Sequence, residues 1–168
     1  TLDGKYFVYA HIIAPHPPFV FDGVGNLVPQ DMPFTLNDAN YYIREHSQKN
    51  YIAGYRRQIQ YVNTLVLETI DAILTRSTTP PIIILQGDHG PGAHLHWGSL
   101  EQTIPAERFG ILNAYYFPDQ DYALLYPSIS PVNSFRVVFN QFFDVDFALL
   151  PDRHYYSPWS FPFDFVEI

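Results

Sequence analysis

The chain has 168 residues, 47% of them hydrophobic and 15% charged, which is the composition of a globular protein and not of a disordered one. Its 17 acidic and nine basic residues give a net charge of −8, so it lacks the cationic surface that nucleic-acid binding requires. It contains no cysteine for a disulfide and no apolar stretch of about 18 residues to span a membrane, so we expect one soluble domain over residues 1–168.

The first predicted element is a strand over residues 5–13. This segment is aromatic and β-branched without clean alternation, which is typical of a strand buried on both faces. A proline-rich stretch at residues 14–19 ends it. Residues 20–48 are rich in Gly, Pro, Asn and Asp and are expected to form a long loop. The chain begins at residues 1–4, directly before the strand, as an excised fragment would.

A periodic apolar pattern predicts a helix over residues 48–76. Apolar side chains recur from Ile52 to Ile73 at intervals of three and four residues. Gly54 weakens this helix by about 1 kcal/mol relative to alanine without breaking it. Residues 81–85 then form a second buried strand. Strand, long helix and strand make a βαβ unit, so the two strands are expected to be parallel.

Two further elements follow. Residues 109–117 are a third strand candidate, and Ser130 with Pro131 begins a helix that runs to about Phe143. The tail from Asp144 is expected to hold no more than a short strand. The predicted fold class is therefore α/β, a partial three-layer α/β/α sandwich with a mostly parallel sheet.

The candidate site residues follow the predicted parallel strands. His16 comes just after the first strand, and Asp88 and His89 come just after the second. Because the carboxyl ends of parallel strands open onto one edge of a sheet, we expect these side chains to meet there. Three more histidines are candidates for the same edge: His11, His94 and His96.

The pair Asp88-His89 is a candidate metal site. A carboxylate and an imidazole suit Zn²⁺ or Mn²⁺, with Ca²⁺ and Mg²⁺ as further candidates, and Gly87 and Gly90 let the turn bend. The alternative is a polar turn after a strand with no ligand role. The position after an all-apolar strand, with other histidines in reach, favours the metal site.

Residues 82–90, IIILQGDHG, resemble the strand and metal-binding turn of the alkaline phosphatase superfamily. They are most similar to the branch that holds sulfatases, lipoteichoic acid synthases and phosphoethanolamine transferases. His11 and His16, the latter followed by Pro18, resemble the histidine segment of the same branch. The order of elements is also similar, and the resemblance covers residues 5–143.

The resemblance implies that Asp88 and His89 are metal ligands and that His16 binds the phosphate or sulfate of the substrate. His11, His94 and His96 would contact the substrate, or a second metal in the case of His94 or His96. The family's nucleophile and an acidic metal ligand belong to the N-terminal half of its domain, and no nucleophile motif occurs here. Two histidines match nothing in the family and are expected to be surface or packing residues: His46 and His154.

The chain would then be the C-terminal part of a metal-dependent hydrolase or transferase acting on phosphate or sulfate esters, and inactive alone. Its parent protein would be anchored in a membrane, with the catalytic domain on the extracytoplasmic face. One alternative is a non-catalytic sulfatase-like module that binds an anionic glycan or a partner. Another is an unrelated α/β domain in which Asp88-His89 is structural. The aromatic share of 17% fits either a carbohydrate or lipid-headgroup pocket, or a surface covered by missing polypeptide.

Overall fold

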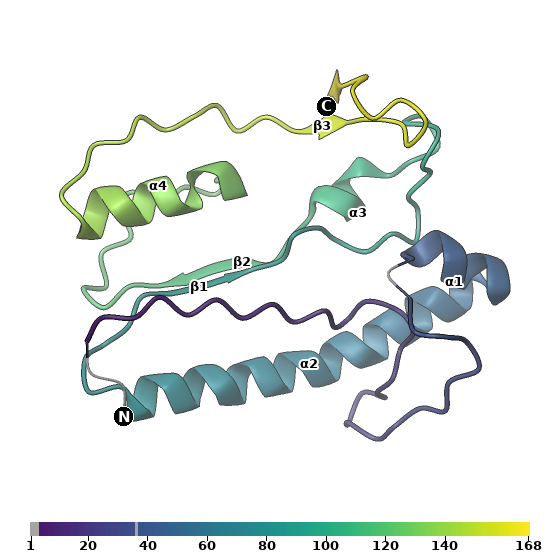
Figure 1. Ribbon diagram of the computed structural model, residues 1–168, viewed down its shortest axis with the longest axis horizontal. Coiled ribbons are helices and arrows are strands. Elements are labelled where there is room, and N and C mark those ends of the chain that lie inside the picture. Colours follow the sequence, from purple (N-terminus) through teal and green to yellow (C-terminus); the bar gives the residue numbers. More distant parts are fainter. Residues whose placement is uncertain (1–3, 36) are drawn as a thin grey trace. The chain divides into compact units, whose positions relative to one another are not determined.

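The computed structural model describes residues 4–35 and 37–168 (Figure 1). The chain divides into two compact units, residues 1–69 and 70–168, and the boundary falls within the helix α2 (Gln48–Arg76). From the sequence, residues 1–4 are expected to be the start of an excised fragment. Of these, residues 1–3 lie outside the described part. Among the helices of the described residues, none combines the length and the apolar character needed to cross a membrane.

The first unit contains the helix α1 (Ala39–Glu45) and most of α2. The bounds of α2 confirm the helix predicted from periodicity. By contrast, α1 lies in the stretch that was expected to be a loop throughout. It begins at Asp38, whose side chain accepts a hydrogen bond from the backbone N–H of Ala39 (2.7 Å), a capping role that suits aspartate.

Phe19 packs the chain before α1 onto the helix α2. Its side chain is 4% exposed, and its ring centroid lies 5.0 Å from that of Tyr42 and 5.3 Å from that of Tyr51. A Cβ atom at Gly54 would collide with the Phe19 ring. Gly54 has a low helix propensity, but its missing side chain is what lets the Phe19 ring approach the backbone of α2.

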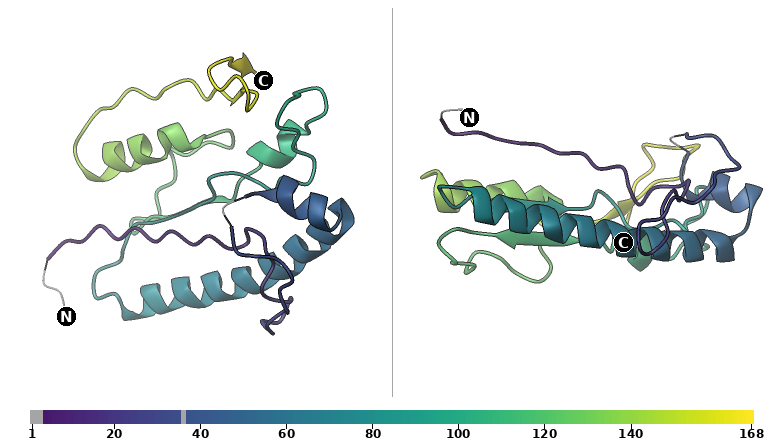
Figure 2. Two further views of the ribbon diagram at one scale, coloured as in Figure 1. Left: turned by 45° about the vertical axis from the view of Figure 1, so that its right-hand side comes forward. Right: turned by 90° about the horizontal axis from the view of Figure 1, so that it is seen from below.

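Residues 5–13 do not form the predicted strand. They are extended, but they pair with no strand among the described residues. Figure 2 accordingly draws them as a plain tube without an arrow. Val8 is 83% exposed and Tyr9 is 77% exposed. Their composition favours an extended backbone, but a buried strand also needs neighbours on its edges and faces. The βαβ unit predicted from this segment is therefore absent.

In the second unit, β1 (Ile83–Gln86) pairs with β2 (Asn113–Tyr116). The pairing is antiparallel, with Ile83 opposite Tyr116 and Gln86 opposite Asn113. The intervening chain contains only the five-residue helix α3 (Pro105–Phe109). A parallel pair needs a long crossover, usually a helix, whereas a chain that doubles back places its strands antiparallel.

The predicted fold class, an α/β three-layer sandwich with a mostly parallel sheet, is therefore wrong. In the described part of the chain there are two small sheets, each of two antiparallel strands: β1 with β2, and β3 (Tyr155–Tyr156) with β4 (Val166–Glu167). Local composition identified the apolar strands, but their direction depends on how distant segments pair.

The core of the second unit forms where α4 (Pro131–Phe142) meets β2 and the residue that follows it. Ser130 is the N-cap residue and Pro131 opens the first turn, which confirms the predicted start of this helix. Phe117, Val137 and Val138 are buried together. Partly buried apolar side chains surround these three: Ile82, Ile84, Tyr115, Leu125, Ile129 and Phe142.

Candidate functional site

The turn after β1 carries the candidate metal ligands. Asp88 Oδ2 lies 3.5 Å from His89 Nε2, and Asp88 Oδ1 accepts a hydrogen bond from the backbone N–H of His89 (3.0 Å). The Asp88 side chain is 82% exposed and that of His89 is 39% exposed. The carboxylate and the imidazole are therefore close enough to contact one ion, and both are open to solvent.

The hydrogen bond of His89 Nδ1 fixes which ring nitrogen is free. Nδ1 lies 2.9 Å from the carbonyl oxygen of Gly90. A carbonyl oxygen only accepts, so Nδ1 carries the proton and the neutral ring keeps its lone pair on Nε2, beside Asp88. Metal-binding histidines are oriented in this way by a backbone carbonyl on the other nitrogen. A proton on Nε2 would instead give an ion pair with Asp88, so protons compete with a metal.

Gly90 fastens the turn to the chain around α3. Its N–H donates to the carbonyl of Arg108 (2.7 Å), and its carbonyl accepts a hydrogen bond from Arg108 Nη1 (3.0 Å). A Cβ atom at this position would collide with the carbonyl oxygen of Glu107. Close approach of two backbones, and not a left-handed conformation, is what requires glycine here.

Asp88 and His89 fit one part of a divalent metal site. No cluster of three or more His, Cys, Asp or Glu side chains that could hold a metal occurs within residues 4–35 and 37–168. Zinc takes at least three protein ligands in its catalytic sites and four in its structural ones. The two donors have the right chemistry for Zn²⁺ or Mn²⁺, and the remaining ligands would have to come from other groups.

His94 is tied to α3. Its backbone N–H donates to Glu107 Oε2 (2.8 Å), and its ring Nδ1 lies 3.2 Å from Glu107 Oε1. This double contact fixes the loop before α3 to the helix. His96 has an exposed side chain, while its backbone N–H donates to Thr103 Oγ1 (3.0 Å) and its carbonyl accepts from the hydroxyl of Tyr156 (2.8 Å). Their predicted substrate contacts stay predictions.

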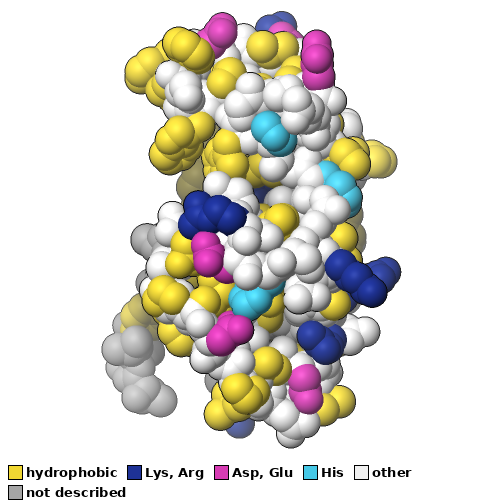
Figure 3. Space-filling model, turned by 90° about the vertical axis from the view of Figure 1, so that its right-hand side faces the viewer, with side chains coloured by type: hydrophobic (Ala, Val, Ile, Leu, Met, Phe, Trp, Pro, Cys, Tyr) yellow, Lys and Arg dark blue, Asp and Glu magenta, His cyan; other side chains and the backbone are white. Residues whose placement is uncertain are grey.

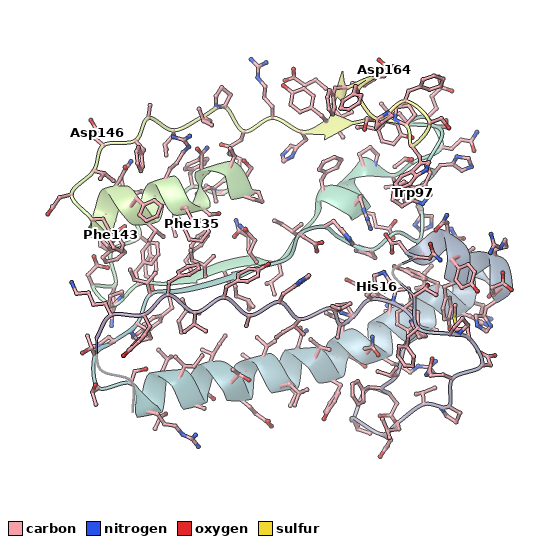
Figure 4. All side chains as sticks on the ribbon, in the orientation of Figure 1. His16, Trp97, Phe135, Phe143, Asp146 and Asp164 are labelled. Atoms are coloured by element: carbon pink, nitrogen blue, oxygen red, sulfur yellow. The ribbon has the colours of Figure 1, made fainter. Side chains whose placement is uncertain are left out.

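His16 and His11 belong to the first unit. His16, labelled in Figure 4, lies in the turn that ends the extended segment, and its Nδ1 lies 2.6 Å from the carbonyl oxygen of Pro17. As in His89, the carbonyl makes Nδ1 the donor and leaves Nε2 free. His11 is exposed, with its ring 6.3 Å from that of Tyr9. Without a parallel sheet, the reasoning that placed these histidines and the Asp88-His89 turn at one sheet edge no longer applies.

Sequence reasoning missed a hydrogen-bonded cluster around Asp152. The carboxylate accepts hydrogen bonds from the hydroxyl of Tyr126 (2.6 Å), the backbone N–H of Ser130 (2.8 Å) and the side-chain amide of Asn133 (3.1 Å). Burial opposes ionisation, but the bonds from Ser130, Tyr126 and Asn133 prevail and hold the pKa of Asp152 below its ordinary value. Burial, and then the bond to Asp152, raises the pKa of Tyr126.

Comparison of the chain with protein-family models, with curated proteins and with solved structures gave no match. The resemblance to the sulfatase-like branch thus rests on the residues that carry it, the turn at 87–90 and the histidines at 11 and 16.

Proposed function

We propose that this chain is the metal-binding, C-terminal part of a hydrolase or transferase that acts on phosphate or sulfate esters. The observation that carries the proposal is the Asp88-His89 pair, in which the hydrogen bond from Nδ1 to Gly90 leaves the Nε2 lone pair beside a carboxylate. The resemblance of residues 82–90 to the sulfatase-like branch gives this pair its expected substrate class.

The remaining ligands and the nucleophile would come from a further polypeptide, the N-terminal half of such a domain. The apolar segment at residues 5–13 supports this partner, because side chains on both of its faces are exposed, among them Val8, Tyr9 and Ile12. Figure 3 shows several separate groups of hydrophobic side chains on the surface that it draws. Burying apolar surface away from water contributes about 25 cal/mol of binding free energy per Å². A polypeptide that covered residues 5–13 would therefore be held to the chain by the burial of these side chains.

In the assembled site, Asp88 and His89 would hold Zn²⁺ or Mn²⁺, with Ca²⁺ and Mg²⁺ as alternatives. The bound ion would supply neutralisation of charge on the phosphoryl or sulfuryl oxygens. The resemblance gives His16 contact with such an anionic group, to which Nε2 could donate only in the imidazolium form, because the Nδ1 proton is bonded to the carbonyl of Pro17. Contacts to the rest of the substrate would fall to His11, His94 and His96. The parent protein would act on the extracytoplasmic face of a membrane.

Calorimetric titration of Zn²⁺ and Mn²⁺ into the chain and its variants tests this proposal. We expect weak binding, and we expect His89→Ala and Asp88→Asn each to weaken it at least about tenfold, the scale on which metal-site contacts act. His46→Ala is a matched control, because His46 Nε2 also lies near a carboxylate, 3.4 Å from Asp31 Oδ1. Lowering the pH should weaken binding, since the ligand imidazole must be neutral.

Equal losses in His89→Ala and His46→Ala would show that the ion does not distinguish the Asp88-His89 turn from another His–Asp pair of the chain. No loss in any variant would show that residues 87–90 form a turn without a ligand role. In either case the function would rest on the sequence resemblance alone.

A further inference from the structure

A cavity of about 640 Å³ opens in the second unit. Its wall combines residues from the end of α3, from β2, from the loop before α4 and from the chain just before β3. The volume lies within the range of about 300–1,000 Å³ that is usual for small-molecule sites. A small molecule would fit in a space of this volume, which is broadly open to solvent.

Aromatic rings and proline rings form much of the wall. Phe109, Tyr115, Tyr122 and Tyr126 all line the cavity, together with Pro127. Such rings offer flat apolar faces, and the tyrosines add a polar edge. A ligand with apolar C–H faces and a polar rim matches this surface.

Hydrogen bonds and ring stacking hold the three tyrosine side chains of the wall in place. The Tyr126 hydroxyl donates to the carboxylate of Asp152 (2.6 Å), and the Tyr115 hydroxyl lies 2.6 Å from Ser134 Oγ. The Tyr122 ring stacks on the buried Phe117, with centroids 5.4 Å apart. A wall fixed in this way costs little ordering when a ligand binds.

Two polar side chains of the wall remain available for a ligand. The imidazole of His154 contacts the Phe109 ring (centroids 5.2 Å apart), and within the described residues it forms no side-chain hydrogen bond. The same holds for the Ser128 hydroxyl, which lies on an exposed loop. Between them these side chains can donate to and accept from a hydroxyl-rich molecule.

The charges around the cavity argue against an anionic ligand. Among the described residues that line it, none is lysine or arginine. The ionised carboxylate of Asp152 stands directly behind Tyr126 and Ser130. A phosphate or sulfate group would find no lysine or arginine among the lining side chains and would be repelled by Asp152.

We propose that this pocket binds a neutral saccharide, with a sugar ring against the tyrosine and proline faces and its hydroxyls on His154 and Ser128. The proposal stands on the cavity, its aromatic wall and its unused polar groups, and it does not depend on metal binding at Asp88-His89. It gives a role to His154, which matches nothing in the sulfatase-like branch.

Saturation-transfer NMR with the full chain tests this site. The probes are methyl β-glucoside, N-acetylglucosamine and maltotriose, with glucose 1-phosphate as the anionic comparison. We expect transfer to at least one of the neutral sugars and weaker binding of the phosphorylated one. His154→Phe keeps a ring against Phe109 but removes both nitrogens, so it should raise the Kd at least about tenfold, as loss of about 1.4 kcal/mol does.

Ser128→Ala provides a second variant on an exposed loop, where the fold tolerates substitution, and should raise the Kd about threefold to tenfold. Ser160→Ala, at another exposed serine of the same unit, should leave the Kd unchanged. Absence of transfer from all three neutral sugars would overturn the proposal. Tighter binding of glucose 1-phosphate, or an unchanged Kd in both His154→Phe and Ser128→Ala, would do so as well.

Discussion

The side-chain amide of Gln58 in α2 donates a hydrogen bond to the backbone carbonyl of His16 (3.3 Å). Its oxygen accepts the backbone N–H groups of Val20 (2.6 Å) and Phe21 (3.2 Å). Gln58 is 1% exposed, so its side chain depends on these partners and not on water. One buried side chain thus fastens the whole turn that carries His16 to the helix.

Replacing Gln58 by leucine should destabilise the protein by about 3 kcal/mol. The change leaves two N–H groups and one carbonyl without their partner, and each unsatisfied buried group costs about 1–3 kcal/mol, part of which water will recover. Urea unfolding followed by circular dichroism measures the difference. Gln60→Leu, two residues away on an exposed position of α2, should change the stability by less than about 0.5 kcal/mol. Similar losses in both variants would contradict this account of Gln58.

Gly54→Ala should also destabilise the protein, against the sign of helix propensity. Alanine is favoured over glycine by about 1 kcal/mol within a helix, but its Cβ atom would overlap the Phe19 ring, and overpacking costs about 1–3 kcal/mol. In a Phe19→Ala background the overlap is gone, so the same substitution should become stabilising. Gly98→Ala, where a Cβ meets no atom within 4 Å, is the control. Stabilisation by Gly54→Ala in the otherwise unchanged chain would show that Phe19 does not pack as described.

Local sequence signals predicted the two long helices, α2 and α4, but missed the short helices α1 and α3 and the direction of the strands. The apolar period of α2 and the Ser130-Pro131 start of α4 depend only on neighbouring residues, and both helices are present. The short helix α1 was missed because polar residues surround it. The strands β1 and β2 were found from composition, but their antiparallel register is set by segments about thirty residues apart, where no local pattern applies.

The same distinction holds for the candidate site. Asp88 and His89 are adjacent in sequence, so their proximity could be predicted from the chain itself. The cluster at Asp152 joins it to Tyr126, Ser130 and Asn133, which are 26, 22 and 19 residues away. No motif marks such a cluster, because folding alone brings its members together. The pocket beside His154 was beyond sequence reasoning for the same reason.

The chain alone should not hydrolyse aryl phosphates, phosphodiesters or sulfate esters in the presence of Zn²⁺ or Mn²⁺. It carries no recognisable nucleophile motif, and Asp88 and His89 supply only two ligands where a catalytic zinc site uses three. A colorimetric assay of the purified chain measures this. Metal-dependent turnover that disappears in Asp88→Ala would show that the chain holds a complete active site.

Asp152 should make the stability of the second unit depend on acid pH. Burial raises the pKa of this carboxyl group, but the hydrogen bonds from Ser130, Tyr126 and Asn133 outweigh burial and lower the pKa from its ordinary value of 3.8. A group with a depressed pKa in the folded state contributes its full stability above the unfolded pKa and loses it as the pH falls through the folded pKa. Stability should therefore be level above about pH 5 and fall below about pH 4.

Asp152→Asn removes this titration while keeping the shape of the side chain. We expect it to cost about 2 kcal/mol at neutral pH, because hydrogen bonds to a charged acceptor are lost. Between pH 5 and pH 3 the variant should then lose less stability than the unchanged chain, in urea unfolding monitored at both pH values. Asp146→Asn, at an exposed position of the same unit, serves as the matched control and should leave the acid-induced loss as it is. If Asp152→Asn and the unchanged chain lost equal stability between these pH values, another carboxyl group would be responsible for the acid response.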